Sequence, residues 1–319
     1  MSNSSDFLLD IRPQCKHERS RVLYRINDYS VVECEDCGFR KTHPIPAFNS
    51  IEEIYNKRFY FGDQSRRFRT IPEMIVRFFR FFRAFKIFIF YRPKRILDVG
   101  CGRGLMLFYL KKYFKATFVL GTQFSDPAIK YAREKLGLEV RKGDLREFFK
   151  EIPNNLDMIS FWHVLEHIDD VEAYICISYE LLRKGGRLLI EVPNSESFSQ
   201  RLTGKSWIGW DLPNHLTHFT NQSLTKLLTE HGFTITKKRY FSSEYSIFMT
   251  MQSFLNKISG QQNLFYNFLC VGGVGRRSFS EFIAHALLAI VLLPLAFVAN
   301  VILGNTRHGE VIHFIAHKP

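Results

Sequence analysis

The feature that most constrains this chain is an apolar run at residues 96–99 that leads directly into three glycines at alternate positions. Asp98 lies near the end of the run, and the glycines are Gly100, Gly102 and Gly104. This pattern predicts a buried strand that turns sharply into a helix. Glycine is needed in such a turn because the backbone takes a positive φ, or because a side chain would keep a ligand away from the backbone. The turn is therefore a candidate ligand-binding loop, and a glycine-rich turn without a ligand is the alternative.

The segments that follow this turn indicate which class of α/β protein the chain resembles. The spacing G-x-G-x-G differs from the G-x-G-x-x-G of dinucleotide-binding turns. Four later segments continue the pattern, and they are residues 116–121, 143–145, 156–167 and 182–194. In this order, and together with the glycine turn, they resemble the motifs of the class I S-adenosylmethionine (SAM)-dependent methyltransferases. The resemblance extends over residues 90–319 and implies a Rossmann-like α/β sheet whose last two strands, at 233–236 and 311–316, pair antiparallel.

The resemblance also implies a set of residues that bind SAM. Asp144 stands where related enzymes place an acid against the adenine amino group. Gln123 stands where the family usually has an acid for the ribose hydroxyls, about 20 residues after the glycine turn. Glutamine is uncharged, so this departure gives some support to a scaffold that has kept the fold without the chemistry. The implied SAM-binding residues are Asp98, Gly100, Cys101, Gly102, Gly104, Gln123, Asp144, Leu145 and His163.

Two clusters of polar residues are candidates for the chemistry. Methyl transfer from a sulfonium needs a nucleophile that is held in line and deprotonated as it reacts, so the protein has to supply a base. The segment 214–220 resembles an H-x-x-[aromatic or His]-F-[Ser/Thr] element of sugar-modifying relatives, whose first histidine is the general base; here that residue is His215. His163 resembles the residue that lines the methionine of SAM, and Glu166-His167 resembles a motif of ubiquinone-type O-methyltransferases near a metal-assisted catechol. The predicted catalytic residues are His215, His163 and Glu166, and a helix cap or a packed loop residue is the alternative for each.

The amino-terminal segment has a different character. Residues 34–38 form a C-x-x-C-G knuckle, a tight turn that can place two thiolates on one metal ion. The segment resembles a zinc ribbon found ahead of some bacterial methyltransferases, including enzymes that methylate nucleotide-linked sugars. In that ribbon the first pair is C-x-x-C, whereas here Glu18 takes the second position, so either His17 or Glu18 would be the fourth ligand. The alternative is a metal-free relic of the same fold. The predicted zinc ligands are Cys15, His17, Cys34 and Cys37.

The segment 74–91 is rich in both positive charge and aromatic rings. Basic residues recur at every third position, and phenylalanines fill much of the remaining surface; they are Arg77, Arg80, Arg83 and Lys86, and Phe78, Phe81, Phe82, Phe85 and Phe88. The spacing predicts a helix with a basic stripe and an aromatic face. One interpretation is the family's helix across the glycine-turn strand, with its aromatic face in the core. The other interpretations are a helix on an anionic membrane surface and an RNA-binding helix that stacks bases.

The segment 282–303 contains no charged residue when histidine is taken as neutral, and it is long enough to span a bilayer core. It lies between two segments that should pair as antiparallel strands, so both of its ends should lie on one side of a membrane. Pro294 would kink or split a helix, and Arg277 and Arg307 flank the segment with positive charge. We therefore predict a monotopic insertion, kinked or hairpin-like, with a buried lid or a dimer interface as the alternative.

The predicted organisation has four parts, which are a zinc-ribbon-like segment at 1–62, a SAM-binding domain at 63–241, a hydrophobic helical insertion at 242–308 and a last strand at 309–319. The net charge of +13 favours an anionic partner. We predict a SAM-dependent methyltransferase, peripheral or monotopic at the cytoplasmic face of the inner or plasma membrane, that acts on a sugar or lipid-linked glycan precursor. The alternatives are a quinone or other lipid as acceptor, an RNA-binding or RNA-modifying protein, and a non-catalytic scaffold. Nucleic acid is disfavoured because no Asn-Pro-Pro-Tyr-like element follows the predicted fourth strand. The oligomeric state stays open.

Overall fold

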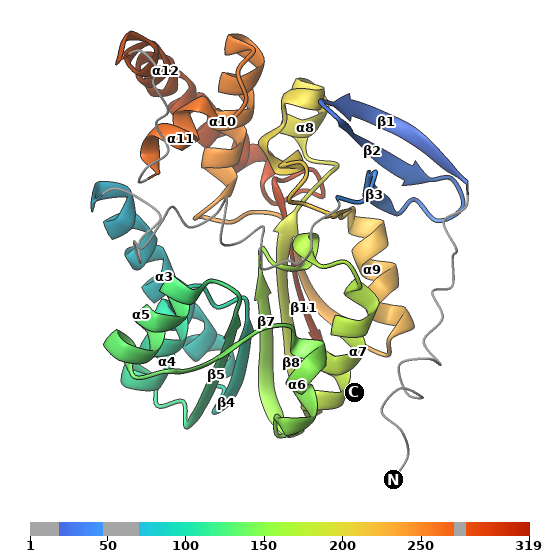
Figure 1. The fold of residues 1–319 in the computed structure, drawn as a ribbon, viewed down its shortest axis with the longest axis vertical. Coiled ribbons are helices and arrows are strands. Elements are labelled where there is room, and N and C mark those ends of the chain that lie inside the picture. Colours follow the sequence, from blue (N-terminus) through green and yellow to red (C-terminus); the bar gives the residue numbers. More distant parts are fainter. Residues whose placement is uncertain (1–18, 47–69, 271–278) are drawn as a thin grey trace.

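The computed structural model describes residues 19–46, 70–270 and 279–319 (Figure 1). Its centre is a seven-stranded sheet in the order β10-β11-β8-β7-β4-β5-β6. The strands of this sheet are β4 (Arg95–Val99), β5 (Phe118–Gln123), β6 (Glu139–Lys142), β7 (Leu156–Trp162), β8 (Leu182–Pro193), β10 (Thr234–Arg239) and β11 (Val311–His317). β4 pairs in parallel with β5 and β7, whereas β11 pairs antiparallel with both β8 and β10. This arrangement confirms the predicted α/β fold with an antiparallel strand pair at its carboxyl end.

Helices cover both faces of the sheet, because parallel strands are joined by crossovers that bury them on both sides. The helices are α3 (Thr70–Tyr91), α4 (Leu105–Tyr113), α5 (Asp126–Leu136), α6 (Leu145–Phe148), α7 (Val171–Leu181) and α9 (Asn221–Glu230), with 3-10 helices at Phe149–Glu151 and Leu165–His167. α3, α4 and α5 pack on one face around Ala84, Met106 and Ile129. α7 and α9 pack on the other face around Ile175 and Leu224. The carboxyl ends of the parallel strands are therefore the edge at which a ligand can reach the sheet.

A second sheet joins the amino-terminal segment to the large domain. Its strands are β1 (Ser20–Ile26), β2 (Tyr29–Cys34), β3 (Arg40–His43) and β9 (Thr217–His218), in the order β1-β2-β3-β9. The loop between β8 and β9 holds α8 (Phe198–Thr203) and the 3-10 helices Gly204–Ser206 and Ile208–Trp210. β3 pairs antiparallel with β9, and Arg40 lies opposite His218. Val31 of β2 packs in one cluster with Trp207. The described part of the amino-terminal segment is thus built onto the loop that carries His215.

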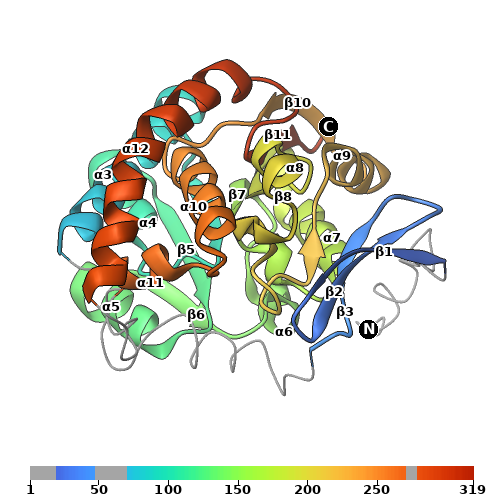
Figure 2. The ribbon, with the colours of Figure 1, turned by 90° about the horizontal axis from the view of Figure 1, so that it is seen from above.

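An insertion of three helices separates the last two strands. It contains α10 (Ser246–Ser259), α11 (Leu264–Leu269) and α12 (Phe279–Leu303), and Figure 2 shows it along one side of the molecule. Because β10 and β11 pair antiparallel, the insertion leaves and rejoins the sheet at the same end. α12 continues through Pro294 as one helix, so the hairpin form of the prediction is wrong. Residues 280–303 are long and apolar enough to cross a membrane, and most of the segment is not buried.

α12 touches the protein through one narrow face. Its Ala289 and Ala296 pack against Leu255 of α10, and Asn300 donates a hydrogen bond to Oγ1 of Thr250 at 2.9 Å. The large apolar side chains on the rest of the helix are exposed, and they are Ile283, Leu287, Ile290, Val291, Leu293, Leu295, Phe297, Val298, Val301 and Ile302. An exposed apolar surface of this length is unusual for a soluble monomer.

α3 is oriented the opposite way from the core helix that its aromatic residues suggested. Phe78 is 62% exposed, whereas Arg83 is 9% exposed and Glu73 is also buried. Phe81 and Phe88 have partners on the neighbouring α4 region, since Phe88 stacks on Phe114 with ring centroids 4.9 Å apart. The interpretation that placed the aromatic face in the core is therefore wrong. Arg80 and Arg83 of the basic stripe turn inward because Glu244, from another part of the chain, meets them there, whereas Arg77 is exposed.

Candidate active site

The glycine turn between β4 and α4 needs glycine for conformation and for space. Its three glycines have φ values of +67°, +57° and +73°, which L side chains rarely adopt. A Cβ on Gly100 would come within 2.5 Å of Val164, and one on Gly104 within 2.6 Å of Leu138. Thr122 at the end of β5 holds the turn in place, because its Oγ1 accepts a hydrogen bond from the backbone N–H of Gly100 at 3.2 Å. The turn is thus a fixed loop at the edge where β4 ends.

Asp98 is buried directly before this turn. Its carboxylate accepts a hydrogen bond from Ser160 Oγ at 2.6 Å. Burial raises the pKa of Asp98 to about 6, and the hydrogen bond from Ser160 together with the charges of Arg83 and Arg80 opposes this rise. Burial also raises the pKa of the Cys101 thiol. β4 lies between β5 and β7, where the connections turn to opposite sides, and such a switch point is where open α/β sheets bind ligands.

The two residues predicted to contact the nucleoside are engaged in local structure. Gln123 accepts hydrogen bonds from the backbone amides of the next two residues at 2.7 and 3.3 Å. Asp144 caps α6, pairs with Arg146 at 2.6 Å and accepts a hydrogen bond from Tyr174 at 2.9 Å. Burial opposes the charged form of Asp144, but these partners lower its pKa. Leu145 is fully buried in the core beneath them. The assignment of these residues to adenine and ribose stays a prediction.

A cluster of arginines and acids that sequence reasoning missed lies near the carboxyl end of β8. Arg83 of α3 pairs with Glu244 at 2.6 Å and with Glu191 of β8 at 3.8 Å. Arg80 pairs with Glu244 at 3.0 Å and donates a hydrogen bond to the hydroxyl of Tyr245 at 3.0 Å. The three-residue spacing of the basic side chains was the available signal. Their acidic partners are far away in the sequence, so the signal could not show that the stripe faces inward.

His163 lies in this cluster with a positive φ of 54°. Its Nδ1 is 3.2 Å from Glu166, its Nε2 is 3.4 Å from Glu191, and its ring packs on Tyr245 with centroids 4.0 Å apart. Burial alone would lower the pKa of His163, but the two carboxylates raise it to about 10. This geometry suits an imidazolium that holds two carboxylates in place. It does not suit a proton acceptor, so the predicted role of His163 in lining SAM fits better than a role as base.

Glu166, His167 and His215 form a second cluster, in which their ligand atoms all lie within 4.8 Å of one another. The backbone carbonyl of Asn214 is 3.0 Å from Nδ1 of His167, and that of Gly209 is 2.8 Å from Nδ1 of His215. A carbonyl can only accept, so each Nδ1 carries a proton, and in the neutral form of each ring the lone pair is on Nε2. The buried carboxylate of Glu166 has His163 as its ion-pair partner, with Nδ1 of His163 3.2 Å away. Two neutral imidazoles and a carboxylate arranged in this way could hold a divalent cation.

The predicted zinc ligands are only partly within the described residues. Cys34 ends β2, and its carbonyl accepts a hydrogen bond from Gly38 at 2.9 Å. Gly38 has a φ of +71°, which gives the tight turn expected of a C-x-x-C-G knuckle and places Cys37 inside it. Cys15 and His17 lie outside the described residues. Zinc at this site therefore stays a prediction.

The amino-terminal sheet is fastened to the loop that contains His215, a connection that the sequence did not reveal. Arg40 pairs with Glu33 at 2.7 Å and donates hydrogen bonds to the carbonyl and hydroxyl oxygens of Ser195 at 2.8 and 3.1 Å. Thr42 Oγ1 donates to the backbone carbonyl of His215 at 2.5 Å. The sheet thus holds the backbone directly before β9 and at Ser195. The position of His215 depends on strands that lie more than half of the chain away in the sequence.

Comparison with known proteins agrees with this architecture. Residues 64–238 match a protein family described as "Methyltransferase domain". A ubiquinone biosynthesis O-methyltransferase of Dinoroseobacter shibae is 30% identical over 153 residues, which cover 44% of this chain and 60% of that protein. A probable S-adenosylmethionine-dependent methyltransferase of Mycolicibacterium smegmatis is 26% identical over 145 residues, which cover 44% of this chain and 52% of that protein.

A solved structure gives the same fold. Phosphoethanolamine N-methyltransferase 2 of Haemonchus contortus, in complex with phosphomonomethylethanolamine and S-adenosylhomocysteine, has a TM-score of 0.53 and 15% sequence identity. The match covers 88% of this chain and 62% of that one. At this identity the likeness shows the fold alone. The sequence matches to the two relatives likewise span only part of their length.

Proposed function

The chain belongs to this methyltransferase family, and from that premise we propose that it transfers the methyl group of SAM to an acceptor at a membrane surface. The observation that carries the proposal is the buried Asp98 beside a glycine turn at the switch point of the sheet. Backbone N–H groups of such a turn and the amino terminus of the following helix can approach a bound cofactor closely. Gly100, Gly102 and Gly104 would leave room for it, and His163 would line its methionine.

His215 is our candidate for the general base. The acceptor oxygen would attack the methyl carbon as the bond from that carbon to sulfur breaks, and the electron pair of the broken bond stays on sulfur. The proton of the acceptor hydroxyl would pass to Nε2 of His215, because the carbonyl of Gly209 holds the proton on Nδ1. The tie between Thr42 and the carbonyl of His215 would keep that ring in position. His215→Ala should then lower turnover by about two to four orders of magnitude with SAM affinity nearly unchanged.

The acceptor that we favour is a sugar or a lipid-linked glycan precursor on the cytoplasmic face of the membrane. The apolar surface of α12 and the exposed phenylalanines of α3 support a membrane location. The net charge of +13 supports an anionic surface or a phosphorylated substrate. Both ends of the insertion lie at one end of the sheet, so α12 would lie in one leaflet rather than cross the bilayer.

A second candidate acceptor is a quinone or a related lipid. The observation in its favour is the cluster of Glu166, His167 and His215, which could hold a divalent cation beside a catechol. Several similar proteins are named ubiquinone biosynthesis O-methyltransferases. In this case His215 would be a metal ligand instead of the base. Two results would favour a quinone as acceptor. Turnover should disappear with a chelator and return with a divalent cation, and Glu166→Gln should show a similar loss of turnover.

We also keep the structural zinc as a proposal. Cys34 and Cys37 would supply two ligands from the knuckle, and Cys15 and His17 would complete the site. The double variant Cys34→Ser, Cys37→Ser should lose the metal and loosen the amino-terminal sheet. Elemental analysis that finds well under one zinc per chain in the purified protein would refute this site.

The first experiment for the proposed function is SAM binding by calorimetry. Gly102→Val should abolish binding, because a branched side chain would occupy the space of the ligand. Gly260→Val is the matched control, since Gly260 also has a positive φ, of +70°, but ends α10 and has no atom within 4 Å of its would-be Cβ. Equal binding by both variants, or none by the native protein, would contradict a SAM-dependent activity. Transfer of label from methyl-labelled SAM into the organic or the aqueous phase of a cell extract would then separate lipid from soluble acceptors.

A further inference from the structure

A cavity lies between α3 and the part of the sheet formed by β8, β11 and β10. It has a volume of about 650 Å³, part of which is open to solvent. Its walls combine aromatic rings, such as Phe82, Phe90 and Phe241, with the cationic side chains of Lys86 and Arg239. The side chains of α3 that line the cavity run from Phe79 to Tyr91, and they include the exposed Phe82 and Phe90. The cavity therefore opens on the side of the molecule that carries the exposed aromatic face of α3.

The charges in this cavity are unbalanced. Its two acids are already engaged, since Glu244 pairs with Arg83 at 2.6 Å and Glu191 lies 3.1 Å from His313. Lys86 and Arg239 form no ion pair with a carboxylate of the described chain. Burial lowers the pKa of Lys86, the nearby charges of Arg239 and Arg83 lower it further, and the charge of Glu191 partly opposes them. The pair of Lys86 and Arg239 offers strong binding to a phosphate, because a guanidinium gives paired donors and an ammonium adds a point charge.

The apolar surroundings show what kind of phosphate fits. The ammonium of Lys86 lies 4.4 Å from the centroid of Phe82, whose ring is also exposed at the surface of α3. Phe90 and Phe241 are exposed as well. Figures 1 and 2 place α3 and α12 on the same side of the molecule, so the cavity lies beside two exposed apolar helices. A soluble phosphate would gain nothing from these rings, whereas an acyl or prenyl chain would cover them.

We propose that Lys86 and Arg239 bind the phosphate group of a membrane lipid whose apolar chain lies along α3. This inference rests on the proposed function only in placing the protein at a membrane. The floor of the cavity contains Glu191, which is also 3.4 Å from His163 in the candidate active site. The headgroup would therefore sit one side chain away from the residue that we place beside SAM. The site deepens the proposed function, because it would hold a lipid-linked acceptor by its phosphate.

The test uses the full chain and vesicles of two compositions. One is phosphatidylcholine alone, and the other contains phosphatidic acid, which carries a phosphate monoester. The native protein should bind the second about 30-fold more tightly, because each of the two cations contributes about 1 kcal/mol near an anionic lipid, which is about a fivefold factor. The double variant Lys86→Gln, Arg239→Gln should lose this preference and bind phosphatidylcholine unchanged. Lys184→Gln with Lys226→Gln removes the same charge from other surfaces and should keep the preference. Lys86→Arg should keep it too.

Two further binding measurements distinguish the possible reasons for a negative result. Vesicles with phosphatidylserine, a phosphate diester, at equal net charge report general attraction to anions. Equal binding to them would mean that Lys86 and Arg239 do not recognise the phosphate monoester, which would overturn the site. Glycerol 3-phosphate is a soluble phosphate monoester; if it binds at millimolar concentration and depends on Lys86 while the vesicles show no preference, the site is for a soluble phosphate and the lipid assignment is wrong. SAM binding is measured on the same samples. Absence of SAM binding with an intact lipid preference would refute the proposed function alone, and the reverse result would refute this inference alone.

Discussion

The helices α3 and α9 cover opposite faces of one sheet, and they differ in which kind of side chain they bury. α9 buries Leu224 and Leu228 and exposes Lys226, as an amphipathic helix in water does. α3 buries Arg83 and exposes Phe78. The inward arginine is stable because acids meet it, whereas outward phenylalanines are favourable only when something other than water covers them. This difference is expected if, as we propose, one side of the molecule faces water and the other side faces a membrane.

The largest expected effect concerns α12, which lies on the same side as α3. Replacing Leu287, Ile290 and Val301 by glutamate should weaken binding to neutral vesicles by at least about 1000-fold, because each large apolar side chain contributes about 1.5–3 kcal/mol when it leaves water. Flotation with phosphatidylcholine vesicles measures this effect. The three side chains are exposed, so the fold itself should tolerate the change.

The matched control introduces three glutamates on α9 at exposed positions, namely Gln222, Lys226 and Thr229. This variant should float as the native protein does. If both triple variants lose binding equally, net charge rather than the apolar side decides the association, and the comparison between the two helices fails. A native protein that stays in the aqueous phase without detergent would favour a buried lid or a dimer contact for α12.

The next effect tests the inward face of α3. Arg83→Leu should lower the free energy of unfolding by about 3 kcal/mol, because it takes one cationic partner from both Glu244 and Glu191. Within the described chain, Glu244 then keeps only Arg80 as a cationic partner, and Glu191 keeps only two histidines. Phe85→Ser on the outward face should change it by less than about 0.5 kcal/mol in the absence of lipid. Urea unfolding of both variants measures the difference. A greater loss in Phe85→Ser than in Arg83→Leu would mean that α3 is an ordinary core helix.

The contrast between these helices also shows what the sequence could reveal. The strands of the central sheet and the glycine turn were predictable, because their signals are local: an apolar run, an acid and glycines at fixed spacing. The antiparallel pairing of the last two strands followed from the family resemblance and was confirmed. The orientation of α3 was not predictable from its own residues. The residues of α3 form the same aromatic and basic stripes whichever stripe faces the sheet. The orientation depends on Glu244 and Glu191, which lie more than 100 residues later in the chain.

In the candidate site too, local motifs were predictable and contacts between distant segments were not. The strand, turn and helix around Asp98 and the glycines were predicted correctly, since one motif contains them all, and their contact with SAM stays a prediction. The sequence offered His215 as a base, but it gave no sign that β3 would pair with β9 and fix the backbone there. That pairing joins Arg40 to His218 across most of the chain. Long-range register of this kind depends on tertiary packing, which single-sequence patterns do not contain.

A third effect concerns Glu310, which lies where the chain passes from the helical insertion into β11. Glu310 is fully buried there, and it accepts hydrogen bonds from Ser199 at 2.7 Å and Trp207 at 3.4 Å. Burial raises the pKa of Glu310 to about 7, and these neutral partners together with Thr250 only partly oppose the rise. The folded state thus prefers the protonated acid. Its contribution to stability is full below the ordinary pKa of about 4.3 and is lost as the pH rises through about 7.

The native protein should therefore lose up to about 3 kcal/mol of unfolding free energy from this group between pH 4.5 and pH 7.5. Glu310→Gln mimics the neutral acid, so it should remove this part of the pH dependence and leave the variant more stable than the native protein at pH 8. Unfolding in urea at several pH values measures it, and other titrating groups cancel in the difference between the two proteins. Parallel pH profiles would show that Glu310 is ionised in the fold.

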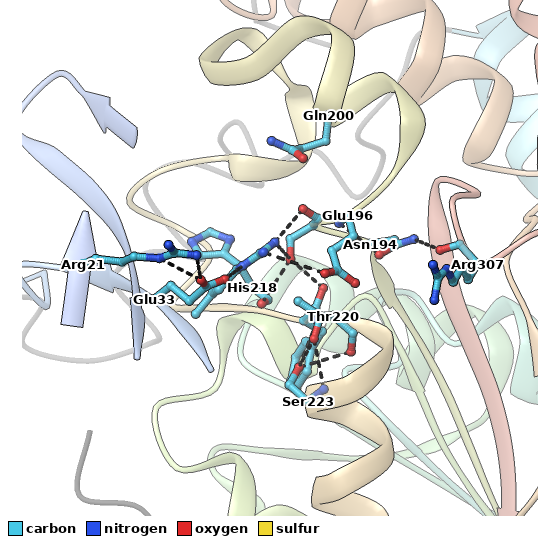
Figure 3. Close-up of polar contacts among 12 residues, drawn as sticks. Arg21, Glu33, Asn194, Glu196, Gln200, His218, Thr220, Ser223 and Arg307 are labelled. Carbon is cyan, nitrogen blue, oxygen red and sulfur yellow. Dashed lines mark hydrogen bonds and ion pairs between the residues drawn. The ribbon is translucent and has the colours of Figure 1, made fainter. Parts of the chain in front are cut away.

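The smallest effect belongs to α9 and serves as the reference for the aqueous side. Thr220 caps this helix in a capping box, in which its Oγ1 accepts from the backbone N–H of Ser223 at 3.0 Å and Ser223 Oγ accepts from the N–H of Thr220 at 2.9 Å (Figure 3). Thr220→Ala should lower the free energy of unfolding by about 1 kcal/mol, the usual cost of losing such a cap. The cost should be the same with and without phosphatidylcholine vesicles, because α9 faces water in both conditions. Phe85→Ser, by contrast, should become costly only when vesicles are present. Two results would show that the two sides of the molecule do not face different media. One is a loss of unfolding free energy in Thr220→Ala that depends on lipid, and the other is a loss in Phe85→Ser that does not.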